Sequence, residues 1–247
     1  MTAPVFLVAS GVLDGAPASL VLDGPEGRHA VSVRRLQVGE EVVLADGEGR
    51  GAHGVVSAVA GKDRLTVDVR GHRTEPAPAV TVTVVQALPK GDRGELAVEL
   101  MTEAGVDAVV PWSAARCVTQ WRGERAAKAL GKWRATAREA AKQARRLRVP
   151  TVHEPMTTRQ VAALLGTADL AAVLHEEGSL PLATASLPAS GSIVLVVGPE
   201  GGVSPEEIAT LTTAGASPYR LGPTVLRTST AGIAAAALLL TRTGRWS

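Results

Sequence analysis

The pattern of apolar residues changes near residue 75. Before it, short apolar runs alternate with turn signals such as Asp46-Gly47, and this spacing predicts a small all-β barrel. The expected strands cover 18–22, 41–44, 55–59 and 65–69. After the proline-containing stretch 74–78, strands alternate with longer helical patterns, which is typical of βαβ units. The chain is therefore expected to be an α/β protein with two domains, residues 1–75 and 76–247.

The elements of the second domain follow from hydrophobic periodicity and from glycine and proline positions. Strands are expected at 80–88, 107–110 (closed by Pro111), 170–174, 193–197 and 219–221; helices at 95–104, 122–147, 158–165, 206–214 and from about 228. A loop is expected at 179–190. The last helix is apolar on every side, so we expect it to be buried in its own domain or against a second copy.

The stretch 193–207 reads IVLVVGPEGGVSPEE and organises the second domain. Its apolar run predicts a strand buried on both faces of a parallel sheet. Three glycines leave the following loop bare, and Ser204, Pro205 and Glu207 suit the start of a helix. Ligands of open α/β sheets bind at such strand ends. A tight turn without a ligand fits this loop equally well.

The chemistry of this loop argues against a phosphate ligand. It lacks both the GxxxxGK[ST] and the GxGxxG spacing, so a dinucleotide oxidoreductase is disfavoured. The carboxylates of Glu200, Glu206 and Glu207 suit a neutral or cationic ligand instead.

Composition limits the remaining possibilities. The 247 residues are 45% hydrophobic and 20% charged, which is ordinary for a soluble globular protein. Cys117 is the single cysteine, which excludes an internal disulfide and a multi-cysteine metal site. We find neither a signal peptide nor an apolar run long enough to span a membrane. We therefore expect a cytoplasmic protein that does not bind a membrane, and the single cysteine adds the expectation that it holds no metal.

Charge is distributed unevenly along the chain. The net charge is only +2, yet residues 116–148 hold 11 basic and 2 acidic residues. An amphipathic helix with a solvated basic face would explain this segment, but the imbalance favours an RNA-facing surface. No series of aromatic residues is interleaved with the basic ones, so stacking on single-stranded RNA is not indicated.

A second bare loop, Leu221 to Ala231, reads LGPTVLRTSTA. Together with GPEGG it resembles the SPOUT class of RNA methyltransferases. In detail it is similar to the RsmE-type enzymes, which methylate N3 of a uridine in 16S rRNA. Their loops read GPEGG and LG-x-x-LR-x-x-TA. One position departs from the pattern, because Ser229 stands where the family often has glutamate.

The resemblance implies a fold and its partners. The C-terminal domain would be a SPOUT domain, a parallel sheet with a trefoil knot, and the N-terminal domain a PUA-like β-barrel that binds RNA. The cofactor would be S-adenosylmethionine, and the substrate 16S rRNA or the small ribosomal subunit. A homodimer through the C-terminal domain is also implied.

Site residues come from the matching motifs, from the basic segment and from the chemistry of methyl transfer. That chemistry suggests catalytic roles for Arg227, which would hold the uracil enolate, and for Glu200, whose carboxylate would favour the sulfonium. Cofactor-binding residues would be Leu174, His175, Glu176, Gly198, Pro199, Glu200, Gly201, Gly202, Leu221, Gly222, Leu226, Arg227 and Thr228. RNA-binding residues would be Arg28, His29, Arg34, Arg35, Lys90, Arg93, Arg138, Lys142, Arg145 and Arg146.

Two alternatives stay open at this point. One is another SPOUT activity, either ribose 2′-O methylation or guanine methylation. The other is an RNA-binding protein that has the fold but no catalysis.

Overall fold

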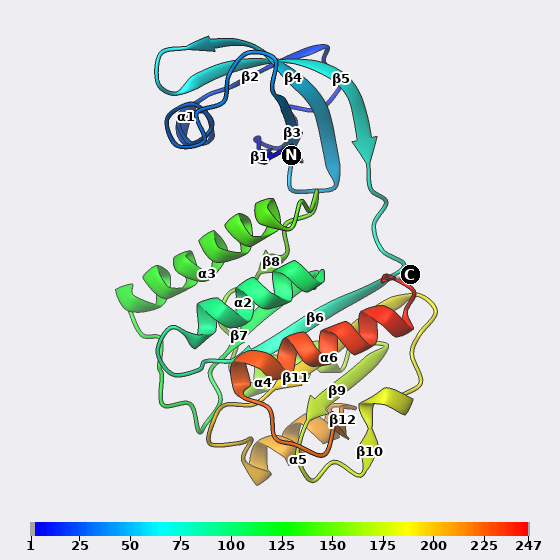
Figure 1. Ribbon diagram of the computed structural model, residues 1–247. Helices are drawn as coiled ribbons and strands as arrows, with labels where there is room; N and C mark the ends of the chain where they lie inside the picture. Colours follow the sequence, from blue (N-terminus) through cyan, green and yellow to red (C-terminus); the bar gives the residue numbers. More distant parts are fainter. Residues whose placement is uncertain (1–2, 247) are drawn as a thin grey trace. The chain divides into compact units, whose positions relative to one another are not determined.

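The chain forms two compact units in the computed structural model, which describes residues 3–246 (Figure 1). Unit 1 contains the chain up to Ala77 and also Ala141–Val149, whereas unit 2 contains Pro78–Ala140 and the chain from Pro150 onward. The sequence-based division placed 141–149 in the second domain. Unit 1 is therefore built from two separate stretches of chain.

Unit 1 contains a five-stranded sheet in the order β1-β3-β4-β5-β2. The strands are β1 Val5–Leu7, β2 Ser19–Leu22, β3 Glu41–Ala45, β4 Arg50–Ala60 and β5 Arg64–Thr74. Only β1 and β3 run parallel, and the other neighbours are antiparallel. Inward side chains such as Phe6, Leu44 and Val67 form the core. All four expected strands are confirmed, and the third and fourth are longer than expected.

Residues 24–33 correct the all-β expectation for this part of the chain. Helix α1 spans Gly24–Arg28 and a π-helical turn follows at His29–Val33. Asp23 stands at the N-cap and Pro25 in the first turn, so a helix start was present where only a turn was expected. Ala30 is fully buried in the core, which anchors the helical segment on the sheet.

The segment 141–149 completes unit 1. Leu147 packs with Val5, Leu7 and Ala45, and its carbonyl accepts a hydrogen bond from the Gly49 N–H at 3.1 Å. The expected helix 122–147 was therefore wrong at its end, because α3 spans Glu124–Gln143. Arg145 follows with φ of 56°, a left-handed conformation that ends the helical path.

Unit 2 is built on a seven-stranded parallel sheet in the order β10-β12-β9-β11-β6-β7-β8. Its strands are β6 Val80–Ala87, β7 Ala108–Trp112, β8 Thr151–Val152, β9 Leu170–Leu174, β10 Leu180–Pro181, β11 Gly191–Val197 and β12 Ser217–Arg220. The five residues from Ile193 to Val197 are all buried, as expected for a central strand.

Two details of unit 2 differ from expectation. Pro111 lies inside β7 and pairs with Gln86, so it does not close the strand. A proline is tolerated there because β8 pairs only with Ala108 and Val109. The expected loop 179–190 contains β10 and a short 3₁₀ helix, Leu182–Thr184.

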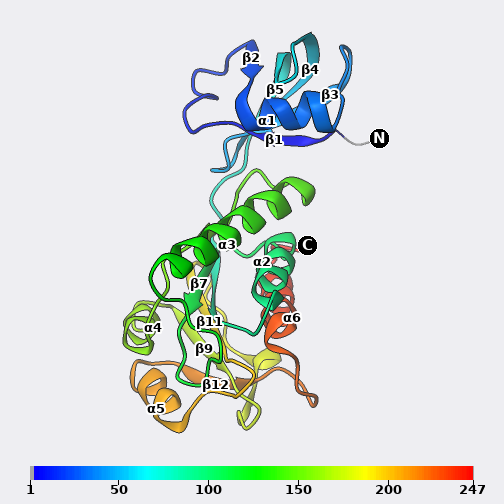
Figure 2. The ribbon, with the colours of Figure 1, turned by 90° about the vertical axis from the view of Figure 1, so that its left-hand side faces the viewer.

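Helices cover both faces of this sheet (Figure 2). Helices α2, Arg93–Ala104, and α6, Thr228–Arg242, lie together on one face, and α4, Thr158–Leu165, and α5, Pro205–Thr213, lie on the other. Gly105 ends α2 with φ of 104°, the expected C-cap. No helix in residues 3–246 is long and apolar enough to cross a membrane.

Helix α6 is buried on one side by its own unit. Gly232, Ala235 and Leu239 are buried, whereas Ile233 and Leu238 are only partly covered. To reach α6 from β12, the chain crosses the carboxyl ends of β9 and β11, which lie between β12 and β6. This crossing agrees with the knotted path that the family resemblance implies.

Candidate functional site

Three loops meet at one edge of the parallel sheet. They follow β9, β11 and β12, which are adjacent strands in the order β12-β9-β11. Because the strands are parallel, their carboxyl ends lie along the same edge. All but one of the predicted cofactor-binding residues are in these loops or at the strand end before them. Thr228, the exception, is the first residue of α6.

The loop after β9 is held against the end of β12. The His175 N–H donates to the Tyr219 carbonyl at 3.0 Å, and the His175 Nδ1 accepts from the Glu177 N–H at 3.2 Å. Gly178 is buried, and a Cβ there would lie 2.7 Å from the Tyr219 carbonyl carbon. Only glycine permits this approach, so the loop has a fixed position beside its neighbour.

The loop after β11 is joined to the loop after β6. A Glu200 carboxylate oxygen accepts from the Lys90 N–H at 3.1 Å and lies 4.0 Å from the Arg93 guanidinium. Gly202 has φ of 73°, a conformation that favours glycine. The structure therefore brings together Glu200, Lys90 and Arg93, which were predicted separately as catalytic and RNA-binding residues.

The start of α5 uses one carboxylate internally. Ser204 and Glu207 form the expected capping box. Glu207 is buried and also accepts from the Ala115 N–H at 2.8 Å and the Thr158 hydroxyl at 2.9 Å. Of the two glutamates that open this helix, only Glu206 is exposed. Hydrogen bonds from its own backbone and from Ser204 lower the pKa of Glu206.

The loop after β12 presents uncovered groups. Arg227 is the N-cap of α6, and its carbonyl accepts from the N–H groups of Thr230 and Ala231, both at 2.9 Å. Its guanidinium is exposed and has no ion pair or side-chain hydrogen bond within the described part of the chain. Val225 is 79% exposed, and a Cβ on Gly222 would meet no atom within 4 Å. A ligand can therefore reach this loop.

Sequence reasoning missed two residues beside these loops. Arg116 donates to the Gly201 carbonyl at 3.1 Å and supports the GPEGG loop. Arg116 follows soon after the end of β7, and this position was the sequence signal that could have marked it as a site residue. Gln86 is fully buried and donates to the Thr228 carbonyl at 3.3 Å, which fixes the start of α6 at the end of β6. Nothing in the sequence marked this amide.

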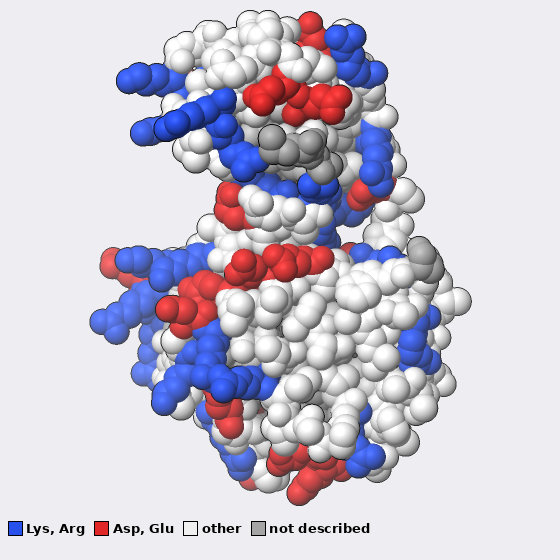
Figure 3. Space-filling model, viewed as in Figure 1, with Lys and Arg blue, Asp and Glu red and all other residues white. Residues whose placement is uncertain are grey.

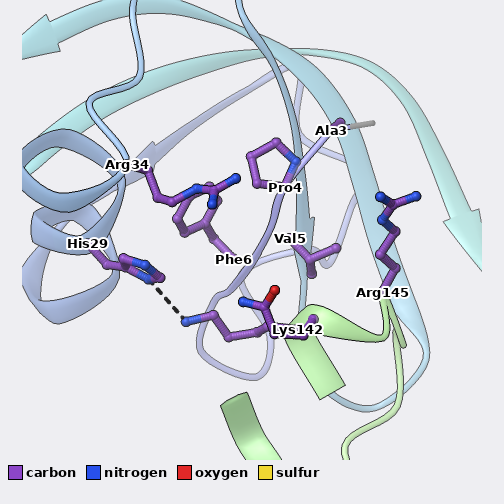
Figure 4. A pocket seen from close by; sticks show the side chains of 9 residues that line it. Ala3, Pro4, Val5, Phe6, His29, Arg34, Lys142 and Arg145 are labelled. Carbon is purple, nitrogen blue, oxygen red and sulfur yellow. Dashed lines mark hydrogen bonds between the residues drawn. The ribbon is translucent and has the colours of Figure 1, made fainter. Parts of the chain in front are cut away.

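Four of the predicted RNA-binding residues of unit 1 line a small basic cavity of about 100 Å³ (Figure 4). His29, Arg34, Lys142 and Arg145 line it. Arg34 and Arg145 are exposed. The outer surface of this unit also carries Arg28, Arg35 and Arg146, the last of them partly buried.

Lys142 differs from the other predicted RNA-binding residues. Its ammonium group is buried, 3.1 Å from a Glu26 carboxylate oxygen and 3.3 Å from His29 Nδ1. His29 in turn contacts Phe6 edge to face, with the ring centres 5.8 Å apart. These contacts give Lys142 an internal role in holding His29 and Glu26.

The predicted RNA-binding residues of unit 2 are Lys90, Arg93 and Arg138, and all three are exposed. Figure 3 shows lysine and arginine side chains gathered on the side where Figure 1 draws α3. Residues 3–246 contain no group of three or more histidine, cysteine, aspartate or glutamate side chains that could hold a metal ion.

Comparison with known proteins gives matches over both parts of the chain. An RNA methyltransferase domain matches residues 75–240, and an RNA methyltransferase PUA domain matches residues 22–70. A Mycobacterium tuberculosis protein named ribosomal RNA small subunit methyltransferase E is 48% identical over 250 residues, covering 100% of this chain and 94% of the relative. A Bacillus subtilis protein of the same name is 32% identical and covers 85% of each chain.

Solved structures agree with this match. A ribosomal RNA small subunit methyltransferase E from Neisseria gonorrhoeae, bound to S-adenosyl methionine, has a TM-score of 0.86 at 27% identity, over 98% of both chains. A putative methyltransferase from Legionella pneumophila with the same bound cofactor has a TM-score of 0.86 at 26% identity, again over 98% of both chains. With its domains, full-length relatives and fold in agreement, this chain belongs to the RNA methyltransferase family that includes the ribosomal RNA small subunit methyltransferases E.

Proposed function

We propose that this protein transfers a methyl group from S-adenosylmethionine to N3 of a uridine in 16S rRNA of the small ribosomal subunit. Family membership supports the reaction class, and the relatives' names support the substrate. The observation that carries the proposal is the meeting of three strand-end loops beside the uncovered Arg227 side chain.

The three loops fit the cofactor. S-adenosylmethionine supplies a methyl group on a positively charged sulfur, next to an adenosine. Backbone groups of Gly198, Gly201 and Gly202 can hold the adenosine edges without side chains in the way. The open space at Gly222 leaves room, and the exposed Val225 and Leu226 offer apolar cover. The partly exposed carboxylate of Glu200 favours a nearby positive charge.

Arg227 has the chemistry that the base requires. The N3 proton of uracil must leave before the nitrogen can attack a methyl group, and the resulting anion spreads over O2 and O4. An arginine stays charged at every working pH and binds such oxygens with two N–H groups. In this proposal the proton goes to solvent and Arg227 stabilises the enolate. Holding the nitrogen in line with the methyl group supplies most of the remaining acceleration.

Ser229 takes no direct part in this scheme. It is only 3% exposed in the first turn of α6, so its hydroxyl faces the protein interior. Substrate orientation therefore rests on Arg227 and on the loop after β6, where Lys90 and Arg93 are exposed.

RNA binding is assigned to exposed basic groups of both units. In unit 1 these are Arg28, Arg34, Arg35 and Arg145, with Arg146 partly covered. Lys142 contributes by positioning His29. In unit 2, Arg138 joins the residues of the loop after β6. Phosphate contacts of this kind make binding depend strongly on salt.

We also propose a homodimer through α6. Its outer side carries Ile233, Ala234, Ala237 and Leu238, all partly exposed and apolar. Figure 3 shows a broad surface without charged side chains where Figure 1 draws this helix. Such a surface suits a second copy of the chain. A cytoplasmic location belongs to the same proposal and is supported by the ribosomal substrate.

Mapping the methylated nucleotide tests this function. Purified protein, labelled S-adenosylmethionine and small subunits from a strain lacking the protein should give one new 3-methyluridine, located by mass spectrometry of 16S rRNA fragments. Small-subunit rRNA from wild-type cells should already carry it. A methyl group on ribose or guanine would contradict the uridine assignment. Binding of RNA without any transfer would support the non-catalytic alternative.

A further inference from the structure

A second cavity, of about 350 Å³, lies in unit 2 between the start of α2 and helix α3. One wall is the loop after β6 and the first turn of α2, including Pro89, Asp92 and Glu95. The other wall comes from Trp121 and from α3. Apart from those in the loop after β6, its residues have no part in the scheme above.

The aromatic floor of this cavity is closely packed. Trp121 and Trp133 contact edge to face, with their ring centres 5.1 Å apart and their planes at 80°. Trp133 is buried, and a Cβ on Gly94 would lie 2.7 Å from its ring, so α2 packs directly against it. Trp121 is only partly buried and lines the cavity. One indole is thus held in place by another and presented to a ligand.

Three cations stand beside this indole. Arg125, Lys128 and Lys132 are spaced three and four residues apart, so they share one side of α3. All three are exposed, and none has an ion-pair partner within the residues that the structure describes. Like charges at this spacing destabilise a helix. A polyanionic ligand would remove that repulsion.

The opposite wall is acidic. Asp92 is exposed and Glu95 partly exposed. Their carboxylates disfavour a phosphate on that side and can accept hydrogen bonds from N–H groups of a base. The cavity is therefore complementary to a nucleotide, because it offers an aromatic floor, hydrogen-bond acceptors on one wall and cations on the other.

The cavity borders the proposed active site. The Pro89 carbonyl accepts from the Thr119 hydroxyl at 2.8 Å, and the next N–H, of Lys90, donates to Glu200. A single short loop thus separates the cavity from GPEGG. RNA bound at this sheet edge would therefore lie within reach of the cavity.

We propose that this cavity binds one nucleotide of the RNA substrate, close in sequence to the methylated base. Its base stacks on Trp121, and its phosphate lies against Lys128 and Lys132. This proposal rests on the proposed function, since it names the part of the substrate that this cavity receives. Base stacking on an aromatic side chain is strong enough to change RNA affinity about ten-fold or more.

Steady-state kinetics with small subunits test the proposal. Trp121→Ala should raise KM for the subunit about ten-fold, whereas Trp121→Phe should stay close to wild type. Lys128→Ala combined with Lys132→Ala should raise KM and make binding less dependent on salt. Arg159→Ala, which removes one exposed charge from α4, is the matched control and should change neither. S-adenosylmethionine affinity should match wild type in all variants. Each variant should still unfold in one cooperative transition, with Trp121→Ala somewhat less stable because it loses the contact with Trp133.

Fluorescence gives an independent readout. A short single-stranded oligoribonucleotide should quench indole emission in wild type. Most of this quenching should be lost in Trp121→Phe, because Trp133, which also lines the cavity, is buried. Wild-type KM in the folded Trp121→Ala and double-lysine variants, or quenching unchanged in Trp121→Phe, would overturn the nucleotide site. If wild type quenches with RNA but transfers no methyl group, the nucleotide site stands and the proposed function fails.

Discussion

The carboxylate of Glu207, in the first turn of α5, accepts a hydrogen bond from the backbone N–H of Ala115 at 2.8 Å. The same buried side chain accepts from the Thr158 hydroxyl, and that hydroxyl accepts from Trp112 Nε1 at 3.2 Å. A single carboxylate thus links α5, α4 and the segment after β7. It thereby fixes the start of α5, the helix that directly follows the GPEGG loop.

Replacing Glu207 by alanine should therefore destabilise the protein. The N–H groups of Ser204 and Ala115 and the Thr158 hydroxyl would lose a buried acceptor, at a cost of about 3 kcal/mol in the free energy of unfolding. Urea unfolding measures this loss. Glu206→Ala, at the exposed neighbouring position, should lower the unfolding midpoint much less. Equal midpoints for the two variants would remove the structural role of Glu207.

Arg227→Ala should abolish methyl transfer and spare the cofactor. The guanidinium is exposed and contributes no ion pair within residues 3–246, so the fold does not depend on it. Loss of one charge-stabilising group costs about 100-fold or more in kcat. Single-turnover transfer and calorimetry with S-adenosylmethionine separate the two effects. Arg227→Lys should recover only part of the rate, since lysine lacks the two-pronged geometry. Wild-type turnover in the alanine variant would exclude a catalytic role.

Gly178→Ala should displace the loop after β9. Its Cβ would press on backbone atoms of Tyr219 and Arg220, which cannot rotate away. We expect a lower melting temperature and weaker binding of S-adenosylmethionine. Gly131→Ala in α3 is the matched control, because a Cβ there meets no atom within 4 Å. It should stabilise the helix by about 0.5–1 kcal/mol. Unchanged cofactor affinity in Gly178→Ala would show that this loop is not part of the site.

Asp46 should make unit 1 sensitive to acid. Burial raises the pKa of this carboxyl, but hydrogen bonds from the Arg50 and Glu48 backbone and from the Arg50 guanidinium outweigh it, so the pKa is lower than usual. The stabilisation is then complete above the ordinary pKa of about 3.9 and is lost as the pH falls through the lowered value. Wild type should be more stable than Asp46→Asn at pH 7, and the gap should narrow below about pH 4 in urea unfolding. A gap independent of pH would contradict this assignment.

Cys117 should react slowly in the folded protein. Burial raises the pKa of its thiol, so little thiolate forms near neutral pH. Alkylation by iodoacetamide at pH 8 should be slow in buffer and fast in urea. Equal rates in the two conditions would mean that this thiol is accessible.

Local sequence signals predicted those parts of the protein that local physics controls. The strand 193–197 and the capping box at Ser204 appear as expected, and α4 has the expected bounds, because buried runs and caps act over few residues. The helix at 24–28 had its own start signal, which was interpreted as a turn.

The features that the sequence did not predict depend on tertiary contacts. Helix α3 ends early because Leu147 packs in the core of unit 1, and no periodicity reports that. The grouping of Glu200 with Lys90, and the support from Arg116, also depend on strand order. Trp121 lines a cavity together with Arg125, Lys128 and Lys132, a grouping that the sequence analysis did not predict.

The two-part construction of unit 1 has a consequence for its synthesis on the ribosome. Val5, Leu7 and Ala45 are made early, but Leu147, which covers them, is added only after most of the first half of unit 2. A nascent chain therefore exposes part of this sheet until residue 149 leaves the exit tunnel. A gene fragment ending at codon 77 would encode the same uncovered surface permanently, so unit 1 cannot be transplanted as one uninterrupted stretch of chain.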